Sequence, residues 1–283
     1  MIKKAFSMIE ISLVLIIIGV VAAGLVKGSS LIKSAQLASA RSLTIKSVVP
    51  NIDGLVVWYE TSLQDSFISS ESSSDGSSIS KWYDISPSSI LSQKNVIGKN
   101  VSNATYKTNG INGIPSLYFA GSINYKLSSF YQGYSTSATV FIVFQPQTTL
   151  SATLIDSISG ATNRVSFTST YITLNAGTSA NTSTASNPAS FVSNQNYILC
   201  AYFNGASSKA YSNNAAVAAG NGTIDAGSNS FRNLTIGSNA DKSNSFKGLI
   251  SEVIIFNRPL KEKERKDIFR YLSIKYKISV KGL

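Results

Sequence analysis

The sequence contains no histidine, a single cysteine and few charged residues, which make up 14% of its 283 positions. Without histidine, the chain lacks the commonest general base, the Ser–His and Cys–His nucleophile pairs and the usual zinc ligand. Cys200 has no second cysteine, so neither an intramolecular disulfide nor a thiolate metal cluster can form. It lies in the apolar run Tyr197–Phe203, where we expect it to pack as a small hydrophobic residue.

Acidic residues are also scarce, since 14 Asp and Glu stand against 25 Lys and Arg, a formal net charge of +11. Much of this excess lies near the end of the chain, at Lys261, Lys263, Arg265, Lys266, Arg270, Lys275, Lys277 and Lys281. A basic helix can meet nucleic acid, anionic lipid or an acidic partner, or can simply present a solvated face. We expect the solvated face here, and we do not expect nucleic acid as a partner.

The N-terminal segment is an apolar run behind two lysines, Lys3 and Lys4. Residues Phe6–Val26 are long enough for a helix to cross a hydrocarbon core of roughly 30 Å. The lysines predict that the N-terminus stays in the cytoplasm and that the rest is exported. A secretory signal peptide or a plain signal anchor would share this hydropathy. Neither accounts for Glu10, a carboxylate at the start of the run.

The stretch Lys3–Leu13 resembles the cleavage and methylation motif of type IV prepilins and pseudopilins. In that family, prepilin peptidase removes a short basic leader, the new first residue is usually an N-methylated phenylalanine, and glutamate stands fifth. The resemblance implies a leader over residues 1–5, a processing site at Ala5 and Phe6, and a role in filament assembly for Phe6 and Glu10. Ala5 stands where the family usually has glycine.

Filament assembly gives this pair of residues a physical role. Cleavage would leave a positive amine on Phe6 and a carboxylate on Glu10, and each charge alone is costly in apolar surroundings. Glu10 of one subunit can neutralise the Phe6 amine of a neighbour. The resemblance therefore implies other pilin or pseudopilin subunits as partners, bound through the N-terminal helix.

A single long helix is predicted over residues 6–50, with a membrane span at about residues 8–26. One face of its second half is expected to pack against the rest of the chain, namely Leu31, Ala35, Ala38, Ser42, Ile45 and Val49. We expect a single-pass protein of the bacterial inner membrane, with a cytoplasmic N-terminus and a periplasmic C-terminal domain. After assembly it would stand in a cell-surface filament.

Residues 51–283 are predicted to form one mainly β domain, because short β-branched and aromatic runs alternate with Ser, Asn, Thr and Gly. Strands are expected at 55–59, 116–119, 139–144, 164–167, 171–174, 197–203 and 249–256. The Ser-rich stretches 66–81 and 175–190 are expected to be surface loops. Thr139–Phe144 is apolar on both faces, which is typical of a central strand between two layers.

Several segments of this domain resemble the laminin-G-like, concanavalin A-like domains of bacterial surface proteins. They are Val57–Tyr59, the W-x-D-x-S sequence Trp82–Ser86, Gly113–Gly121, Gly248–Leu260 and Tyr271–Tyr276. The resemblance implies a two-sheet antiparallel jelly-roll sandwich followed by a short C-terminal helix at about residues 260–277.

Some concanavalin A-like domains are glycosidases, which need two carboxylates roughly 5–9.5 Å apart at one cleft. After the N-terminal helix and before the last one, no two acidic residues lie within three positions of each other, so no strand carries such a pair. We therefore do not expect an enzyme, although acids distant in sequence can still meet in the fold. Glu252 is expected to pair with a basic neighbour or to face solvent.

The same resemblance implies carbohydrate or protein binding, in some members with calcium. Asp84 and Asp241 are the candidate calcium ligands, since both lie in turn-like segments, but capping of a turn is the expected role. Trp58 and Trp82 could stack on a sugar ring, yet their positions in the pattern favour the core. We therefore assign no catalytic, cofactor-binding or metal-binding residue.

Three functions remain open from the sequence. The first is a structural subunit, a minor pilin or pseudopilin of a type IV pilus or type II secretion-like filament, which displays the sandwich as its head. The second is an adhesin or carbohydrate-binding module whose head has a glycan or protein ligand. The third, capture of DNA by the basic C-terminal helix, ranks below both.

Overall fold

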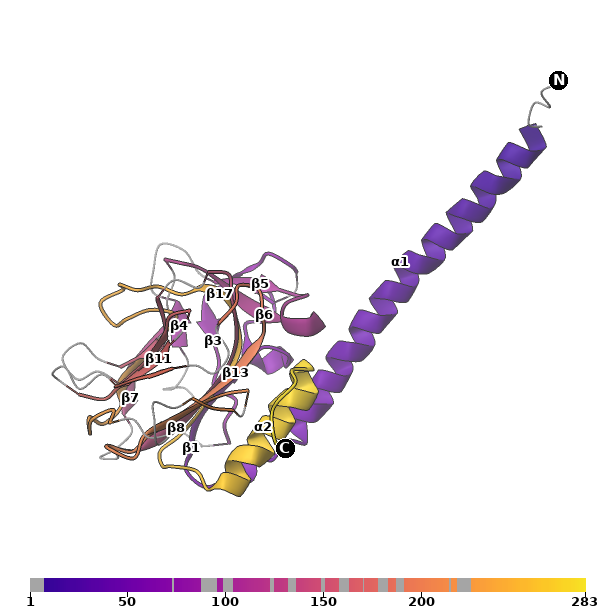
Figure 1. Cartoon of the computed structure of the whole chain (residues 1–283). Coiled ribbons are helices and arrows are strands. Elements are labelled where there is room, and N and C mark those ends of the chain that lie inside the picture. Colours follow the sequence, from indigo (N-terminus) through magenta and orange to yellow (C-terminus); the bar gives the residue numbers. More distant parts are fainter. Residues whose placement is uncertain are drawn as a thin grey trace, which may run out of the picture.

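The computed structural model describes residues 8–72, 74–87, 96–98, 104–122, 125–131, 136–148, 151–157, 163–169, 171–177, 183–186, 191–213, 215–217 and 225–283. A long N-terminal helix leads into a two-layer β-sandwich, and a C-terminal helix lies beside the end of the first helix (Figure 1). The predicted antiparallel sandwich with a C-terminal helix is confirmed.

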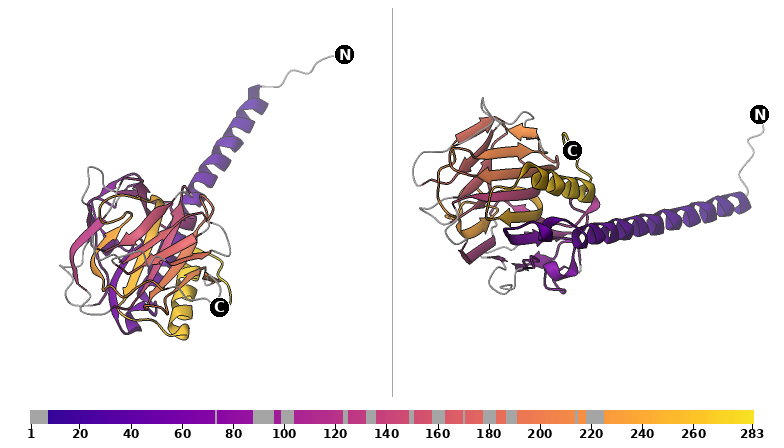
Figure 2. Two further views of the ribbon diagram at one scale, coloured as in Figure 1. Left: turned by 60° about the vertical axis from the view of Figure 1, so that its left-hand side comes forward. Right: turned by 90° about the horizontal axis from the view of Figure 1, so that it is seen from below.

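The helices cover one face of the first sheet, which we call the helix-side sheet (Figure 2). Its strands are β1 (Leu55–Glu60), β2 (Ser78–Ile79), β5 (Ala104–Lys107), β6 (Ser116–Ala120), β8 (Ala138–Pro146), β13 (Tyr197–Phe203), β14 (Lys209–Ser212), β15 (Ala215–Val217) and β17 (Lys247–Phe256). Their order is β15-β14-β13-β8-β17-β6-β5-β2, and β1 also pairs with β17.

The second sheet packs on the other face of the helix-side sheet. Its strands are β3 (Lys81–Trp82), β4 (Val96–Gly98), β7 (Tyr125–Tyr131), β9 (Ala152–Asp156), β10 (Arg164–Phe167), β11 (Tyr171–Asn175), β12 (Ser183–Ser186) and β16 (Arg232–Ile236). Their order is β12-β11-β10-β9-β16-β7-β4-β3. Strands β2 and β12 fall within the two Ser-rich stretches that were predicted to be loops, so that prediction is wrong at these points.

Strand β8 has an apolar core on each face, as predicted for a central strand. Val140, Ile142 and Phe144 face the core between the sheets. Phe141 and Val143 alternate with them and face a second core, which lies under the helices. A strand covered on both faces can be apolar throughout, and this explains why β8 shows no polar alternation.

Helix α1 (Met8–Ile45) has 38 residues and projects from the head, and the 3₁₀ turn η1 (Val49–Asn51) with Pro50 follows it. Its packed face matches the predicted one at Val49, which is buried, and differs from it elsewhere. Ala40 and Thr44 are buried, whereas Leu31 and Ile45 of the predicted face are 69% and 71% exposed. The predicted spacing placed Ala38 and Ser42 on the docked face, but α2 and the sandwich cover a face rotated to Ala40, Leu43 and Thr44.

A hydrocarbon core is roughly 30 Å thick. Across the described residues, no helix combines the length and the apolar character needed to cross a membrane. This finding overturns the predicted span over residues 8–26. It also overturns the predicted single-pass location in the bacterial inner membrane.

Helix α2 (Glu262–Tyr276) lies within the predicted range of about 260–277. The Glu264 carboxylate accepts a hydrogen bond from the Lys261 backbone N–H at 2.7 Å and so caps the first turn. It also pairs with Arg258 at 2.7 Å. The helix ends at Lys277, whose left-handed conformation (φ 51°) closes its last turn.

Candidate functional site

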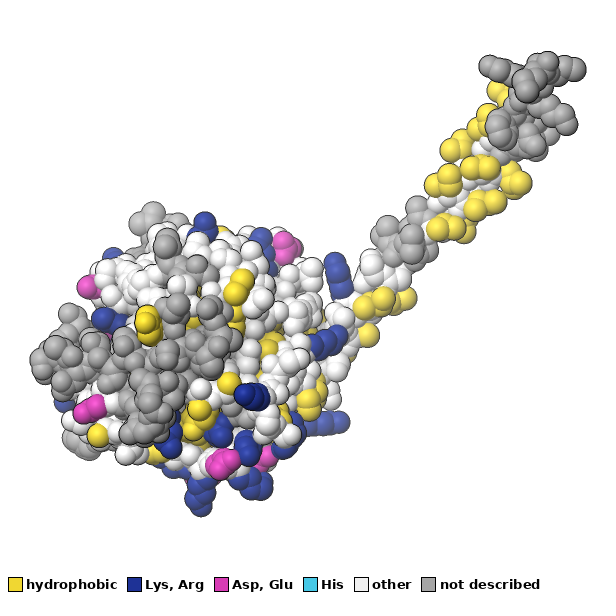
Figure 3. Space-filling view, in the orientation of Figure 1, with side chains coloured by type: hydrophobic (Ala, Val, Ile, Leu, Met, Phe, Trp, Pro, Cys, Tyr) yellow, Lys and Arg dark blue, Asp and Glu magenta, His cyan; other side chains and the backbone are white. Residues whose placement is uncertain are grey.

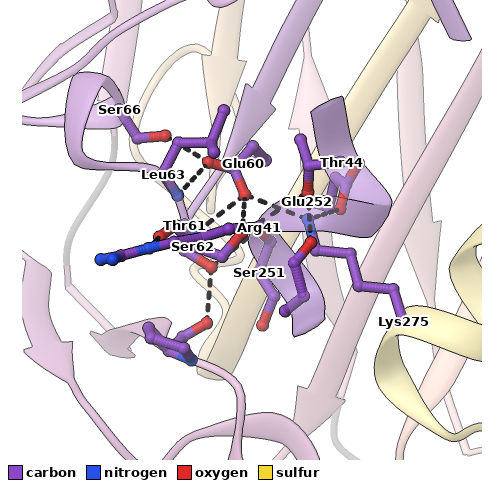
Figure 4. Close-up of polar contacts among 12 residues, drawn as sticks. Arg41, Thr44, Glu60, Thr61, Ser62, Leu63, Ser66, Ser251, Glu252 and Lys275 are labelled. Carbon is purple, nitrogen blue, oxygen red and sulfur yellow. Dashed lines mark hydrogen bonds and ion pairs between the residues drawn. The ribbon is translucent and has the colours of Figure 1, made fainter. Parts of the chain in front are cut away.

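Among the described residues, buried charged side chains converge where the two helices meet the sandwich (Figure 4). Glu60 at the end of β1 is directly opposite Glu252 of β17 in the antiparallel register. Lys275 of α2 reaches both carboxylates, with its Nζ 3.0 Å from Glu60 Oε2 and 2.8 Å from Glu252 Oε2. All three side chains are fully buried. We call these three residues the ionic cluster.

A β-bulge in β17 places Glu252 on the helix-covered face. The pairing register of β17 with β8 shifts between Ile250 and Glu252. Ile250 and Val253 both face the core between the sheets, whereas Glu252 and Ile254 face the helices. An extra residue in one strand reverses the alternation beyond it, and this re-aims the carboxylate.

The Glu60 carboxylate is bound by the turn that follows its own strand. Ser62 donates its backbone N–H at 2.8 Å and its hydroxyl at 2.5 Å. Leu63 donates its backbone N–H at 2.6 Å, and Ser66 donates its hydroxyl at 2.5 Å. A buried carboxylate is tolerated only when such donors replace water. The turn that follows β1 therefore stabilises the ionised form of the buried Glu60 carboxylate.

The Glu252 carboxylate accepts hydrogen bonds from the neighbouring strand β1 and from α2. Trp58 Nε1 donates at 2.7 Å, and the hydroxyls of Tyr271 and Tyr276 each donate at 2.9 Å. The Tyr271 hydroxyl also lies 3.3 Å from Thr44 Oγ1 of α1. The cluster thus ties both helices to the sheet.

The pKa values of the cluster reflect burial and pairing together. Burial alone would raise the pKa of Glu60, but Lys275 and the hydrogen bonds from its turn outweigh burial and lower that pKa. Burial would lower the pKa of Lys275, but Glu252 and Glu60 raise it above its ordinary value. Burial, and then Glu252, raises the pKa of Tyr271 well above its ordinary range. Glu60 and Lys275 therefore remain ionised at neutral pH.

The carboxylates of Glu60 and Glu252 lie close together in the fold. Spacing within one strand could not predict this pair, because the two residues are on different strands. The predicted basic partner of Glu252 is confirmed as Lys275. A glycosidase would need its acid and its base at a cleft open to the sugar. Here Glu60 and Glu252 are 0% and 1% exposed and share one ammonium. The arrangement joins α2 to strands β1 and β17.

The end of α1 is fixed to the sandwich by two further contacts. Arg41 Nε donates to the Ser62 carbonyl at 2.8 Å. Gly113 has φ +85° and lies so close to α1 that an added Cβ would be 2.5 Å from Gln36 Oε1. Glycine adopts this left-handed conformation readily, whereas other residues do so rarely.

The candidate calcium ligands and sugar-stacking residues have structural roles here. Asp84 accepts hydrogen bonds from the backbone N–H groups of Trp58 and Ser86, and Asp241 accepts from Ser243. Trp58 and Trp82 are 3% and 0% exposed, which confirms the prediction that both pack in the core. Among the residues that the structure describes, no three His, Cys, Asp or Glu form a group that could hold a metal.

The basic residues of α2 are largely paired within the helix. Lys263 and Arg270 each contact Asp267 at 2.8 Å, and Lys266 contacts Glu262 at 2.7 Å. Arg265 is buried over the ring of Tyr211. These pairs lower the charge that the helix could offer to a phosphate backbone.

A cavity of about 330 Å³ lies between α1 and α2, and two others open near the helices. One, of about 720 Å³, lies beside the end of α1 and is lined by apolar side chains that include Ile45 and Pro50. The other, of about 440 Å³, lies between the start of α2 and strands β13 and β14 and is lined by Tyr202, Lys209 and Arg265 among others. We call this last cavity the α2 pocket.

Comparison with known proteins defines the head. Residues 121–264 match the concanavalin A-like lectin/glucanases superfamily. The chain belongs to this superfamily. The matched residues of the concanavalin A-like head begin after α1, so the match says nothing about residues 1–50. No curated protein matches the chain in sequence.

Solved structures resemble the concanavalin A-like head in fold. The binding domain of botulinum neurotoxin DC in complex with SialylT has a TM-score of 0.51 at 14% identity, over 78% of this chain and 51% of that one. A mutant Trypanosoma rangeli sialidase with trans-sialidase activity has a TM-score of 0.50 at 14% identity, over 86% and 38%. This chain thus spans little more than a third of that sialidase.

The residues of the prepilin-type motif are not placed by the structure. Ala5 and Phe6 lie outside the described residues, and Glu10 lies in the helical backbone of α1 without a described side chain. Their roles remain predictions from the sequence. The sequence analysis did not identify Glu60 as a site residue. The sequence feature that indicates it is the turn directly after an apolar strand, in which Ser62, Leu63 and Ser66 donate hydrogen bonds to Glu60.

Proposed function

We propose that this chain is a pilin-type filament subunit that displays a concanavalin A-like head. The observation that carries the proposal is the projecting half of α1, whose apolar side chains contact nothing else among the described residues (Figure 3). From Ile11 to Val21, the large apolar side chains are between 51% and 68% exposed. Folded proteins rarely leave so large an apolar surface uncovered.

The distribution of these side chains favours a bundle over a simple dimer. Leu13, Val14, Leu15, Ile16, Ile17 and Ile18 are consecutive, so they point to all sides of the helix. A dimer interface needs only one apolar stripe, whereas a helix that is apolar all round must be surrounded. The α1 helices of several other copies would supply such surroundings along a filament axis.

The N-terminal motif supplies the processing step of this proposal. Prepilin peptidase would cut between Ala5 and Phe6 and release the Phe6 amine. Glu10 of a neighbouring subunit would then neutralise that amine among the packed helices, where an unpaired charge is costly. The subunit would be a minor pilin of a type IV pilus or a pseudopilin of a type II secretion-like filament.

Mass mapping of the N-terminal peptide tests this proposal. The filament fraction should contain a peptide that begins at N-methylated Phe6. If that peptide occurs only in the remaining cell material, a pseudopilin or assembly-initiating role is favoured over that of a pilus subunit. An intact Met1 terminus in cells with an active prepilin peptidase would contradict both.

A second function, recognition of a glycan by the head, is favoured by the superfamily to which the chain belongs. A solved structure of similar fold, with a TM-score of 0.50 at 14% identity, concerns botulinum neurotoxin type C and its interaction with two ganglioside molecules. This chain would bind rather than cleave a sugar, since its paired carboxylates are buried under Lys275. A glycan array probed with the full chain tests this function, and no signal above that of an unrelated filament subunit would contradict it.

A further inference from the structure

The α2 pocket contains a buried hydroxyl group that the fold does not use. Tyr202 of β13 lines the pocket and is 6% exposed. Its hydroxyl has no hydrogen-bond partner within the described part of the chain. Burial raises the pKa of Tyr202 far above its ordinary value, so the group stays a neutral O–H donor. Buried donors are nearly always paired, and one that lines a cavity indicates a ligand or solvent acceptor there.

The charges around the pocket favour an anionic ligand. The Arg265 guanidinium lies 4.0 Å from the centre of the Tyr211 ring, which holds it at the pocket wall. Lys209 of β14 is exposed at the pocket and forms no ion pair with any described residue. The acidic lining residue, Glu262, is already paired with Lys266 at 2.7 Å. The lining therefore has more positive than negative charge.

The size and polarity of the pocket favour a ligand larger than a single inorganic anion. A volume of about 440 Å³ lies within the range of small-molecule sites and is far larger than a single carboxylate or phosphate requires. Asn204 and Ser207 add an amide and a hydroxyl to the lining, so both donors and acceptors are available. Such a lining suits a ligand that carries several hydroxyl groups as well as a charge.

We infer that the α2 pocket binds a carboxylated sugar residue. The ligand's carboxylate would lie near Lys209 and Arg265, and one of its oxygens would accept the hydrogen bond of the Tyr202 hydroxyl. This inference rests on the second proposed function, recognition of a glycan by the head, and it assigns that function to one site. It does not depend on the filament proposal.

Titration of the purified full chain with three small probes tests the ligand class. Isothermal calorimetry or saturation-transfer NMR would compare glucuronate with glucose and with inorganic phosphate. Glucuronate should bind at least about tenfold more tightly than glucose, because only glucuronate offers a charge-assisted hydrogen bond. No binding of glucuronate up to millimolar concentration would overturn the inference. Equal binding of phosphate would also overturn it, since a bare anion would then explain the site.

Two variants test the site itself. Tyr202→Phe removes only the hydroxyl, and Lys209→Gln removes an exposed charge. Each should weaken glucuronate binding by about tenfold. The thermal midpoint of Tyr202→Phe should not fall, because the hydroxyl has no partner to lose among the described residues. Lys81→Gln, an exposed lysine on the second sheet, is the matched control and should bind as the wild type does.

The two levels of the proposal can fail separately. If the glycan array detects acidic glycans and both variants bind them as well as the wild type does, the head recognises sugar elsewhere and the α2 pocket is the wrong site. If neither the array nor glucuronate gives a signal, the function and the site both fail. Lower stability of Tyr202→Phe would show a structural role for the hydroxyl and would overturn the assignment.

Discussion

Glu60 lies directly opposite Glu252 across β1 and β17, and the two carboxylates are held together by a single ammonium group. Like charges at opposite positions of a sheet destabilise it unless a counter-charge intervenes. Lys275 supplies that charge from α2, so this pair of like charges is also a point at which the C-terminal helix is held to the sheet.

We expect Lys275→Met to lower the free energy of unfolding by about 3–5 kcal/mol, because it leaves two buried carboxylates without their partner. Denaturant unfolding followed by tryptophan fluorescence measures the change. Lys263→Met in the same helix is the control, since the side chain of Lys263 is 89% exposed and its loss should change stability little. Equal effects of the two substitutions would show that the ionic cluster does not stabilise the fold.

Acid should weaken the cluster through Glu60. Its pKa is lower in the folded chain than the ordinary value of 4.5, so its ionised form contributes full stability above about pH 4.5. That contribution is lost as the pH falls from 4.5 towards the folded-state pKa. Glu60→Gln should therefore be less stable than the wild type at pH 7 and should lose less stability between pH 4.5 and 3. An equal loss of unfolding free energy between pH 4.5 and 3 in the two proteins would contradict this assignment.

Tyr271→Phe should loosen α1 without unfolding the head. Its hydroxyl bonds Glu252 and lies 3.3 Å from Thr44 Oγ1, so its removal breaks a contact between α1 and the cluster. We expect a loss of about 1–2 kcal/mol and faster amide hydrogen exchange around Thr44. Tyr118→Phe, which removes a hydroxyl bonded to Gln147 at the surface, should leave exchange in α1 unchanged.

Glu10→Gln should be cleaved normally yet enter filaments poorly, because the Phe6 amine of the neighbouring subunit would lose its counter-charge. The ratio of processed subunit in the filament fraction to that in cells measures the effect. Glu262→Gln removes an exposed carboxylate of α2 and should assemble as the wild type does. Normal incorporation of Glu10→Gln into filaments would contradict the proposed pairing of Glu10 with the Phe6 amine.

Ala5→Gly restores the residue usual at the prepilin cleavage site. We expect it to be processed at least as fast as the wild type, and Ala5→Lys to stop processing. Pulse-chase labelling of the full-length and processed forms gives both rates. Unchanged processing in Ala5→Lys would place the cut elsewhere.

Cys200 should resist thiol reagents in the native protein. It is fully buried in β13, and burial raises the pKa of its thiol well above the ordinary value. Labelling should therefore appear only as the head unfolds, and its rate should rise in Lys275→Met. Rapid labelling of the native chain would show that the core under the helices opens locally.

The elements predicted best from the sequence are those whose own residues determine their structure. Strands β8, β13 and β17 are long apolar runs, and α2 has both helical spacing and a capping glutamate, Glu264, at its start. The short strand β2 was missed because its two residues, Ser78 and Ile79, carry too little pattern to separate them from the surrounding serines.

The site was harder to predict because it depends on contacts between distant segments. Glu60 and Glu252 are 192 positions apart in sequence, and only the register of β1 with β17 brings them together. The bulge after Ile250 reverses the facing of Glu252, and no feature of the sequence marks it. The docked face of α1 was mispredicted for a related reason, since Thr44 is buried by its partners in α2 rather than by its own apolarity.

The position of β17 in the fold has a consequence for synthesis. It is the last strand of the chain, yet it pairs with β1, β6 and β8 and thereby joins the helix-side sheet together. Until a ribosome has released Lys247–Phe256, these three strands have no common partner, and the core between the sheets lacks its central member. The head must therefore fold late and as a unit, and a nascent chain would need protection from aggregation for most of its translation.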